Sequence, residues 1–124
     1  MGKPLALIVE DHVDAAVIFS EAMKSAGFET ETVRSGDAAL AKLSVIVPDI
    51  VVLDLQLPHV EGADILHQIR ADERLNETRV IVATAHPHRA ADLQDEADLV
   101  LIKPVGFHQL RGLGERLSPL KSVG

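Results

Sequence analysis

The stretch IVVLDLQLP, residues 50–58, places an aspartate directly after a run of branched apolar residues. Four such residues, Ile50 to Leu53, precede Asp54, and Pro58 ends the stretch. A run this short and this apolar is typical of a strand buried on both faces, as in the centre of a parallel sheet. Because a buried carboxylate is costly unless another group pairs with it, we expect Asp54 to have a partner where the strand ends.

Four further segments of strand length lie on either side of this stretch. Three are apolar runs like the first. The fourth, FETETV, alternates charged and uncharged residues, as an edge strand with one solvent-exposed face does. Apolar residues at helical spacing separate the segments. The predicted strands are Leu5–Val9, Phe28–Val33, Ile50–Leu53, Val80–Ala83 and Leu99–Ile102.

Local signals set several helix boundaries. Gly27 is expected to end the first helix, and Ser35 is expected to cap the second, Gly36–Val45. The last helix contains Gly112 and Gly114, each costing about 1 kcal/mol relative to Ala. We therefore expect its end to be loose.

Regular alternation of strands and helices predicts an α/β fold, with a doubly wound, open, parallel five-stranded sheet and helices on both faces. The length of 124 residues suits one domain over residues 1–124, with a core of about residues 4–118 and a frayed tail at 119–124. In such folds the functional site lies at the carboxyl ends of the strands.

Charge and composition exclude several classes of function. The formal net charge of −7 opposes direct binding to nucleic acid or anionic membrane. There is no Cys to form a disulfide or hold a metal. Neither a signal peptide nor an apolar stretch near the roughly 20 residues of a membrane helix is visible, so we expect a soluble cytoplasmic domain.

Polar residues follow four of the predicted strands and should meet at one edge of the sheet. Glu10 and Asp11 follow the first strand, Asp54 the third, Thr84 the fourth and Lys103 the fifth. Three carboxylates held together would repel one another unless Lys103, taken as the only cation at a strand end, or a divalent metal relieved the repulsion. Hard oxygen ligands without Cys favour Mg²⁺.

This set of groups suits phosphoryl chemistry. Asp54 could act as a nucleophile toward a phosphoryl group, and Mg²⁺ and Lys103 would neutralise the added charge. The Thr84 hydroxyl and the backbone N–H of Ala85 would donate hydrogen bonds to phosphoryl oxygens. The small side chain of Ala85 would leave room for the group.

Taken in order, these motifs resemble the response regulator receiver domain of two-component signalling, in its stand-alone form. The resemblance covers almost the whole chain, from about Leu5 to Leu117. Any one of the dipeptides means little, but all of them at strand ends are a specific signal. The matching motifs are ED at residues 10–11, DLQLP at 54–58 with Gly62 after it, TA at 84–85 and KP at 103–104.

The resemblance implies a flavodoxin-like (βα)5 sheet in the strand order 2-1-3-4-5, and a phosphoacceptor function. Asp54 would receive the phosphoryl group from a phosphohistidine of a sensor histidine kinase or a histidine phosphotransfer protein. The domain would catalyse only its own Mg²⁺-dependent phosphorylation and dephosphorylation, with Thr84, Lys103 and the Ala85 N–H binding the phosphoryl group. It would signal by binding a partner protein or by relaying the group, as a monomer or weak dimer. The implied metal ligands are Glu10, Asp11, Asp54 and the backbone carbonyl of Gln56.

Two departures from the family pattern concern the output. Val100 stands where the family usually has Tyr or Phe, so the usual coupling between Thr84 and an aromatic ring cannot operate. Only 19 positions separate Thr84 from Lys103, which predicts a short fourth helix after Pro87.

Four histidines, His12, His59, His86 and His88, are expected in loops at the functional edge. The simplest interpretation is that they are solvated loop residues. A sharper hypothesis is that His86 lies over the phosphoryl group and tunes its hydrolysis, as the Gln56 side chain could also do. Capture of a transition metal by His86 and His88 is a weaker alternative.

Three other functions remain as alternatives. A receiver-like interaction domain that is never phosphorylated would fit Val100 and the short helix, although every acceptor residue is present. A phosphatase of the haloacid-dehalogenase type needs a second Asp where Gln56 stands. A flavin binder would need a Ser/Thr-rich phosphate loop and aromatic residues, and EDHVDAA at residues 10–16 offers neither.

Overall fold

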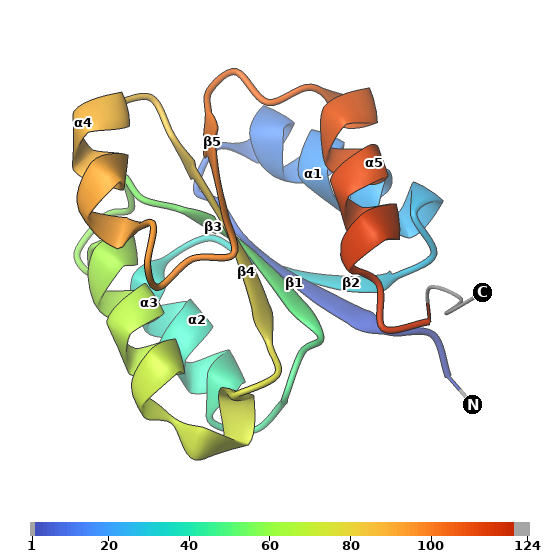
Figure 1. Ribbon diagram of the computed structural model, residues 1–124, viewed down its shortest axis with the longest axis horizontal. Helices are drawn as coiled ribbons and strands as arrows, with labels where there is room; N and C mark the ends of the chain where they lie inside the picture. Colours follow the sequence, from blue (N-terminus) through green and yellow to red (C-terminus); the bar gives the residue numbers. More distant parts are fainter. Residues whose placement is uncertain (1, 121–124) are drawn as a thin grey trace.

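The computed structural model describes residues 2–120 and contains one parallel sheet covered on both faces (Figure 1). Five strands lie in the order β2-β1-β3-β4-β5, as the sequence predicts. Residues 121–124 of the tail expected to fray, 119–124, fall outside the described residues. The strands are β1 (Leu5–Val9), β2 (Glu29–Val33), β3 (Ile50–Asp54), β4 (Arg79–Thr84) and β5 (Leu99–Ile102).

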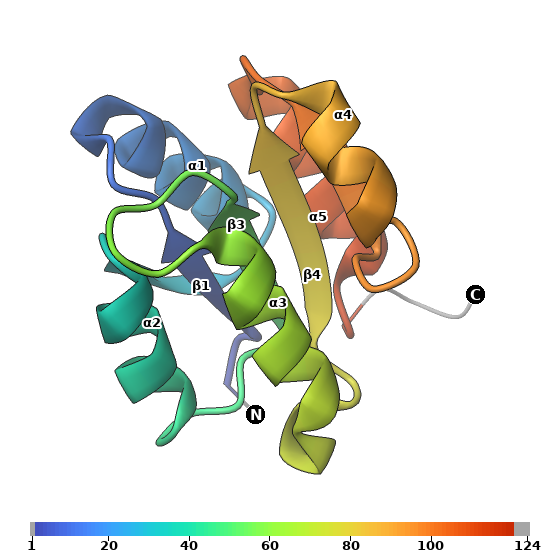
Figure 2. The same ribbon diagram turned by 90° about the vertical axis from the view of Figure 1, so that its left-hand side faces the viewer.

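Helices α1 and α5 cover one face of the sheet, and α2, α3 and α4 cover the other (Figures 1 and 2). Every residue of β3 is buried, which confirms that the opening stretch forms a central strand. Over the described residues, no helix combines the length and the apolar content needed to cross a membrane. The helices are α1 (Val13–Ser25), α2 (Gly36–Leu43), α3 (Gly62–Ala71), α4 (Pro87–Ala90) and α5 (Phe107–Leu117), with 3-10 turns η1 (Glu73–Leu75) and η2 (Ala91–Leu93).

The local signals at helix ends are largely confirmed. Gly27 follows the last residues of α1 with a φ of 100°, a conformation that Gly adopts without strain. The Ser35 hydroxyl accepts a hydrogen bond from the Ala38 N–H at the start of α2. Helix α2 ends at Leu43 rather than Val45, and α4 is as short as expected.

Gly114, one of the two glycines expected to loosen the end of α5, lies against α1. A Cβ there would be 3.0 Å from the Met23 sulfur and 3.1 Å from the Ala26 Cβ. The missing side chain therefore lets the two helices approach closely, and it is a packing feature.

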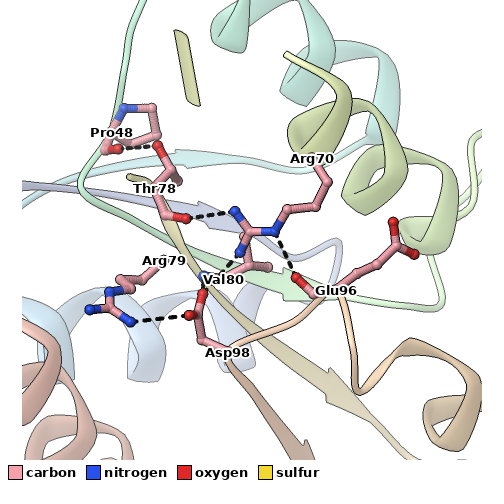
Figure 3. A network of polar contacts seen from close by, with 7 residues as sticks. All are labelled: Pro48, Arg70, Thr78, Arg79, Val80, Glu96 and Asp98. Carbon is pink, nitrogen blue, oxygen red and sulfur yellow. Dashed lines mark hydrogen bonds and ion pairs between the residues drawn. The ribbon is translucent and has the colours of Figure 1, made fainter. Parts of the chain in front are cut away.

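A polar network fixes the chain between η2 and β5, where β4 and β5 begin (Figure 3). The Arg70 guanidinium donates to the backbone carbonyls of Glu96 and Thr78, at 2.7 and 2.9 Å, and to Asp98 Oδ2 at 2.9 Å. Asp98 also accepts from the Val80 N–H at 2.7 Å. The segment that follows α4 is thus held to α3 and β4 at its far end.

Candidate functional site

The polar residues singled out from the sequence do meet at the carboxyl edge of the sheet. In the strand registers, Val9 lies beside Leu53, Asp54 beside Ala83, and Thr84 beside Ile102. The residues that end or follow these strands are therefore neighbours in space.

The three carboxylates form one cluster, in which Glu10 and Asp54 are buried and Asp11 is partly exposed. Each of Glu10, Asp11 and Asp54 offers an oxygen within 4.8 Å of the others, and it is the one group of possible metal ligands in the described part of the chain. Glu10 and Asp54 are buried, at 0% and 1% exposure. Lys103 points inward, with its Nζ 3.1 Å from Glu10 Oε1 and 3.2 Å from Asp54 Oδ1. The Lys103–Pro104 peptide bond is cis.

Burial and crowding change the protonation of the acceptor candidate. Burial raises the pKa of the Asp54 carboxyl to about 7, and the hydrogen bond and charge of Glu10 act in the same direction. The Gln56 N–H and the Lys103 ammonium lower it, but by less. Burial alone would lower the pKa of Lys103, yet Glu10 and Asp54 outweigh that effect and raise it. Lys103 therefore stays charged.

The cluster has the properties of a site for a hard cation. Asp11 Oδ1 and Asp54 Oδ2 are buried side-chain oxygens without a hydrogen-bond partner, which is unusual because buried polar atoms are normally paired. The atoms of this cluster that could bind a metal are all carboxylate oxygens, the ligands that Mg²⁺ prefers. A divalent cation would pair with both oxygens and would relieve the repulsion by Glu10 that adds to the effect of burial on the pKa of Asp54.

Sequence reasoning missed a second cation at this edge. Arg34 directly follows β2, and its Nη2 donates to the backbone carbonyl of Asp11 at 3.2 Å. The statement that Lys103 is the only cation at a strand end is therefore wrong. Arg34 contacts the backbone of Asp11, whereas Lys103 contacts the carboxylates of Glu10 and Asp54.

Thr84 lies in the site with a partner that the sequence did not reveal. Its side chain is fully buried, and its hydroxyl lies 3.2 Å from Gln56 Nε2 and 3.4 Å from Gln56 Oε1. The Gln56 backbone N–H donates to Asp54 Oδ1 at 3.0 Å. Thr84 and Gln56 are 28 positions apart in sequence, so only their places at the ends of adjacent strands indicated that their side chains could meet.

A cavity of about 600 Å³ opens beside Asp54. Residues of α1, among them Ile18 and Phe19, form its apolar wall, and Lys103 and the exposed Ala85 lie at its edge. The cavity gives a reactant access to an otherwise buried carboxylate.

Gly62 has a physical role that its motif did not explain. A Cβ at this position would be 2.5 Å from the Asp54 carbonyl oxygen and 2.7 Å from the Leu55 Cα. The Gly62 N–H also donates to the Leu55 carbonyl at 3.1 Å. The start of α3 therefore packs directly on the backbone of the acceptor residue.

The four histidines are all exposed. His12 and His86 line the cavity, and His86 precedes α4. His59 has a φ of 70° in the β3–α3 connection. His88 lies within α4, so its assignment to a loop is wrong. None of them belongs to the carboxylate cluster, although the rings of His86 and His88 lie 5.9 Å apart.

Val100, the position of the missing aromatic residue, lies in β5 beside Val82. It is partly buried and packs on the apolar cluster that includes Leu93 and Ala97. A small side chain in this place fills the core and leaves no ring that could change orientation when Thr84 moves.

Comparisons with known proteins agree with this geometry. Residues 6–113 match the family model described as the response regulator receiver domain. The chain is 31% identical over 126 residues to the transcriptional regulatory protein TrcR of Mycobacterium tuberculosis, covering 97% of this chain and 49% of that protein. It thus spans about half the length of that curated relative.

Two solved structures have the same fold. The CheY-like receiver domain from Methylobacillus flagellatus has a TM-score of 0.80 and 29% identity, covering 93% of this chain and 98% of that one. The response regulator TrrA from Thermotoga maritima, in complex with Mg(2+)-BeF, has a TM-score of 0.81 and 27% identity, covering 92% and 98%. These similarities confirm the predicted flavodoxin-like sheet.

Proposed function

Because the chain belongs to the family of response regulator receiver domains, we propose that it is a phosphoacceptor switch whose acceptor is Asp54. Receiver domains are signalling domains, and two-component regulators are the relatives of this chain. The finer assignment of acceptor, donor and metal is our proposal.

One observation carries the proposal. A buried aspartate at a strand end lies in an oxygen cluster with Glu10 and Asp11 and within 3.2 Å of the Lys103 ammonium. A structural ion pair would need one carboxylate for one lysine, and the surplus of negative charge is unfavourable unless a cation joins it. A phosphoacceptor site needs such a surplus of oxygen ligands, together with the cavity that opens beside them.

In the proposed reaction an Asp54 oxygen attacks the phosphorus of a phosphohistidine on a sensor histidine kinase or histidine phosphotransfer protein. The new P–O bond forms as the P–N bond breaks, and the imidazole leaves with the electron pair and is then protonated. The Lys103 ammonium and the Thr84 hydroxyl neutralise and orient the phosphoryl oxygens, with the Ala85 N–H as a further donor. The chemistry is the domain's own phosphorylation and dephosphorylation, without turnover of an external substrate.

Glu10, Asp11, Asp54 and the backbone carbonyl of Gln56 would hold Mg²⁺. When bound, the ion supplies positive charge that keeps Asp54 ionised and balances the incoming phosphoryl oxygens. The unpartnered oxygens of Asp11 and Asp54 support this assignment.

The exposed apolar residues on α1 suit a protein donor. Val13, Val17 and Ile18 are 53%, 55% and 43% exposed, and Ile18 also lines the cavity beside Asp54. A donor packed on this face would place its phosphohistidine at the mouth of the cavity. The acceptor would then signal by partner binding or by relaying the group onward.

The alternative of a phosphorylation-independent receiver-like domain rests on Val100 and on the four-residue length of α4. Both features weaken the usual output, but neither affects the acceptor. Phosphorylation of Asp54 is therefore the property that separates the two functions.

The decisive experiment is incubation with acetyl phosphate and Mg²⁺, followed by intact mass measurement. We expect the mass of one phosphoryl group to appear, and to be lost with Asp54→Asn or when EDTA removes the metal. Asp64→Asn, which replaces an exposed carboxylate on α3, is the matched control and should be modified like the wild type. A protein that stays unmodified would favour the phosphorylation-independent alternative.

A further inference from the structure

Gln56 lies between the acceptor and the short helix α4. Its backbone N–H binds Asp54, and its side chain contacts Thr84. It lines the large cavity beside Asp54 and also a second cavity of about 240 Å³, which Arg89, from α4, and Leu93 border on the other side. Gln56 thus contacts the acceptor and Thr84 and shares a cavity with Arg89 of α4.

The Thr84 hydroxyl is held by two neighbouring groups in this arrangement. It accepts a hydrogen bond from the His86 N–H at 3.0 Å, and the Gln56 carboxamide lies 3.2 Å away through its nitrogen and 3.4 Å away through its oxygen. In the shorter contact Gln56 Nε2 donates to the hydroxyl at 3.2 Å, and the alternative, in which the hydroxyl donates to Gln56 Oε1, is longer at 3.4 Å. Either hydrogen bond holds the Thr84 hydroxyl against Gln56, and a move of Thr84 toward a group on Asp54 would break it.

From this geometry we propose that the Gln56 carboxamide is a latch that holds Thr84 in the resting state and is displaced when a group on Asp54 takes the Thr84 hydroxyl. The inference rests on the proposed function, because it assumes that Asp54 is the acceptor. It assigns to Gln56 a positioning role for Thr84.

The surroundings give the displaced side chain a place to go. The second cavity lies on the α4 side of Gln56, with Arg89, Asp92 and Leu93 in its wall. Thr84 is also joined to α4 directly, because it binds the N–H of His86, the residue that precedes this helix. Release of the latch therefore changes two contacts near α4 at once and requires no aromatic ring at Val100.

The test measures binding of beryllofluoride, a phosphoryl mimic, in the presence of Mg²⁺ by fluorine NMR. Gln56→Met keeps the length of the side chain but removes the carboxamide. We expect it to tighten binding roughly 2- to 10-fold, the range for one lost hydrogen bond in the resting state. In a Thr84→Val background the same substitution should leave the affinity unchanged. Gln68→Met, on the exposed face of α3, is the matched control and should have no effect in either background.

Two further measurements keep the test decisive. The first is urea unfolding, without ligand, of the wild type, Gln56→Met, Thr84→Val and the double variant. The changes in unfolding free energy caused by the two single substitutions should not add up to the change in the double variant. Because the chain has no Trp, Ala91→Trp next to α4 gives a single fluorescent reporter. Its emission should shift with beryllofluoride, and Gln56→Met should produce part of that shift without ligand.

The outcomes separate this proposal from the one beneath it. If Gln56→Met changes the affinity equally with Thr84 and with Val at position 84, or if the unfolding stabilities are additive, the latch is refuted while the acceptor function stands. If Gln56→Met does not change the Trp emission, the proposed effect of Gln56 on α4 is refuted. If the wild type binds no beryllofluoride in an Asp54-dependent way, the phosphoacceptor function itself fails, and the latch fails with it.

Discussion

Replacing Asp54 by Asn should stabilise the metal-free protein at alkaline pH. Asp54 is 1% exposed and lies in a cluster with two other carboxylates, so its ionisation is unfavourable in the folded chain. Asn keeps the shape of the side chain and carries no charge. The substitution therefore removes the unfavourable charge while Lys103 keeps its contact with Glu10.

The sign and size follow from the pKa of Asp54, which is about 7 in the folded protein against an ordinary value of 3.8. The folded state holds the proton more tightly than the unfolded state, so protonation stabilises the wild type and this stability is lost as pH rises from 4 to above 7. Asn does not titrate. Between pH 5 and pH 8 the variant should gain about 2 to 3 kcal/mol relative to the wild type, a large share of a typical stability.

The assay is urea unfolding followed by circular dichroism at several pH values, with EDTA present. Asp64→Asn serves as the control for loss of an exposed carboxylate on α3. Added Mg²⁺ should stabilise the wild type more than Asp54→Asn at pH 8, by about 2.7 kcal/mol if the ion is at 100 times its Kd and does not bind the variant. A stability difference that stays constant from pH 5 to pH 8, or an Asn variant less stable than the wild type at pH 8, would refute the reasoning.

Three other predictions test the packing and the edge of the site. Gly62→Ala forces a Cβ to within 2.7 Å of backbone atoms, so the free energy of unfolding in urea should fall by about 1 to 3 kcal/mol and modification of Asp54 by acetyl phosphate should slow. Gly112→Ala is the control, because a Cβ there has nothing within 4 Å, and its free energy of unfolding should instead rise by up to about 1 kcal/mol. Arg70→Met removes the three hydrogen bonds of Arg70 shown in Figure 3 and should lower the free energy of unfolding by about 1 to 3 kcal/mol. The Arg79 side chain is 55% exposed, so Arg79→Met should lower it by less than about 1 kcal/mol. Equal losses in the two variants would contradict this prediction. His86→Ala opens the mouth of the cavity to water and should shorten the lifetime of the phosphorylated protein several-fold, as followed by mass spectrometry, and an unchanged lifetime would reject the tuning role of His86.

The fold and the main site residues could be predicted because both depend on short-range patterns. Apolar runs of strand length alternate with helical spacing, and parallel strands bring their carboxyl ends to one edge. Asp54 and Lys103 are 49 positions apart in sequence, yet Asp54 ends β3 and Lys103 directly follows β5. Their places at the carboxyl ends of parallel strands were enough to predict that they meet, although β5 is only partly buried and not buried on both faces as its apolar run indicated.

Contacts made by side chains across the fold could not be predicted in the same way. The approach of Gly114 to Met23 depends on how closely α1 and α5 pack, and a glycine in a helix otherwise indicates weakness. The contact between Gln56 and Thr84 depends on a side-chain rotamer, because the backbone of Gln56 turns toward Asp54 while its carboxamide reaches β4. No spacing in the sequence encodes either one.

The charge of the site explains why the Thr84 hydroxyl would leave Gln56 in the phosphorylated state. Phosphorylation replaces the single charge of the Asp54 carboxylate by about two on the phosphoryl group, beside Glu10 and Asp11. Hydrogen bonds to ionised acceptors are roughly twice as strong as those between neutral groups, so exchange of the neutral hydrogen bond with Gln56 for one to a phosphoryl oxygen is favourable by about 1 kcal/mol. A gain of this size shifts a two-state equilibrium only about five-fold. The latch would therefore bias α4 between two positions that both remain populated, and a partner that prefers one position would complete the transition.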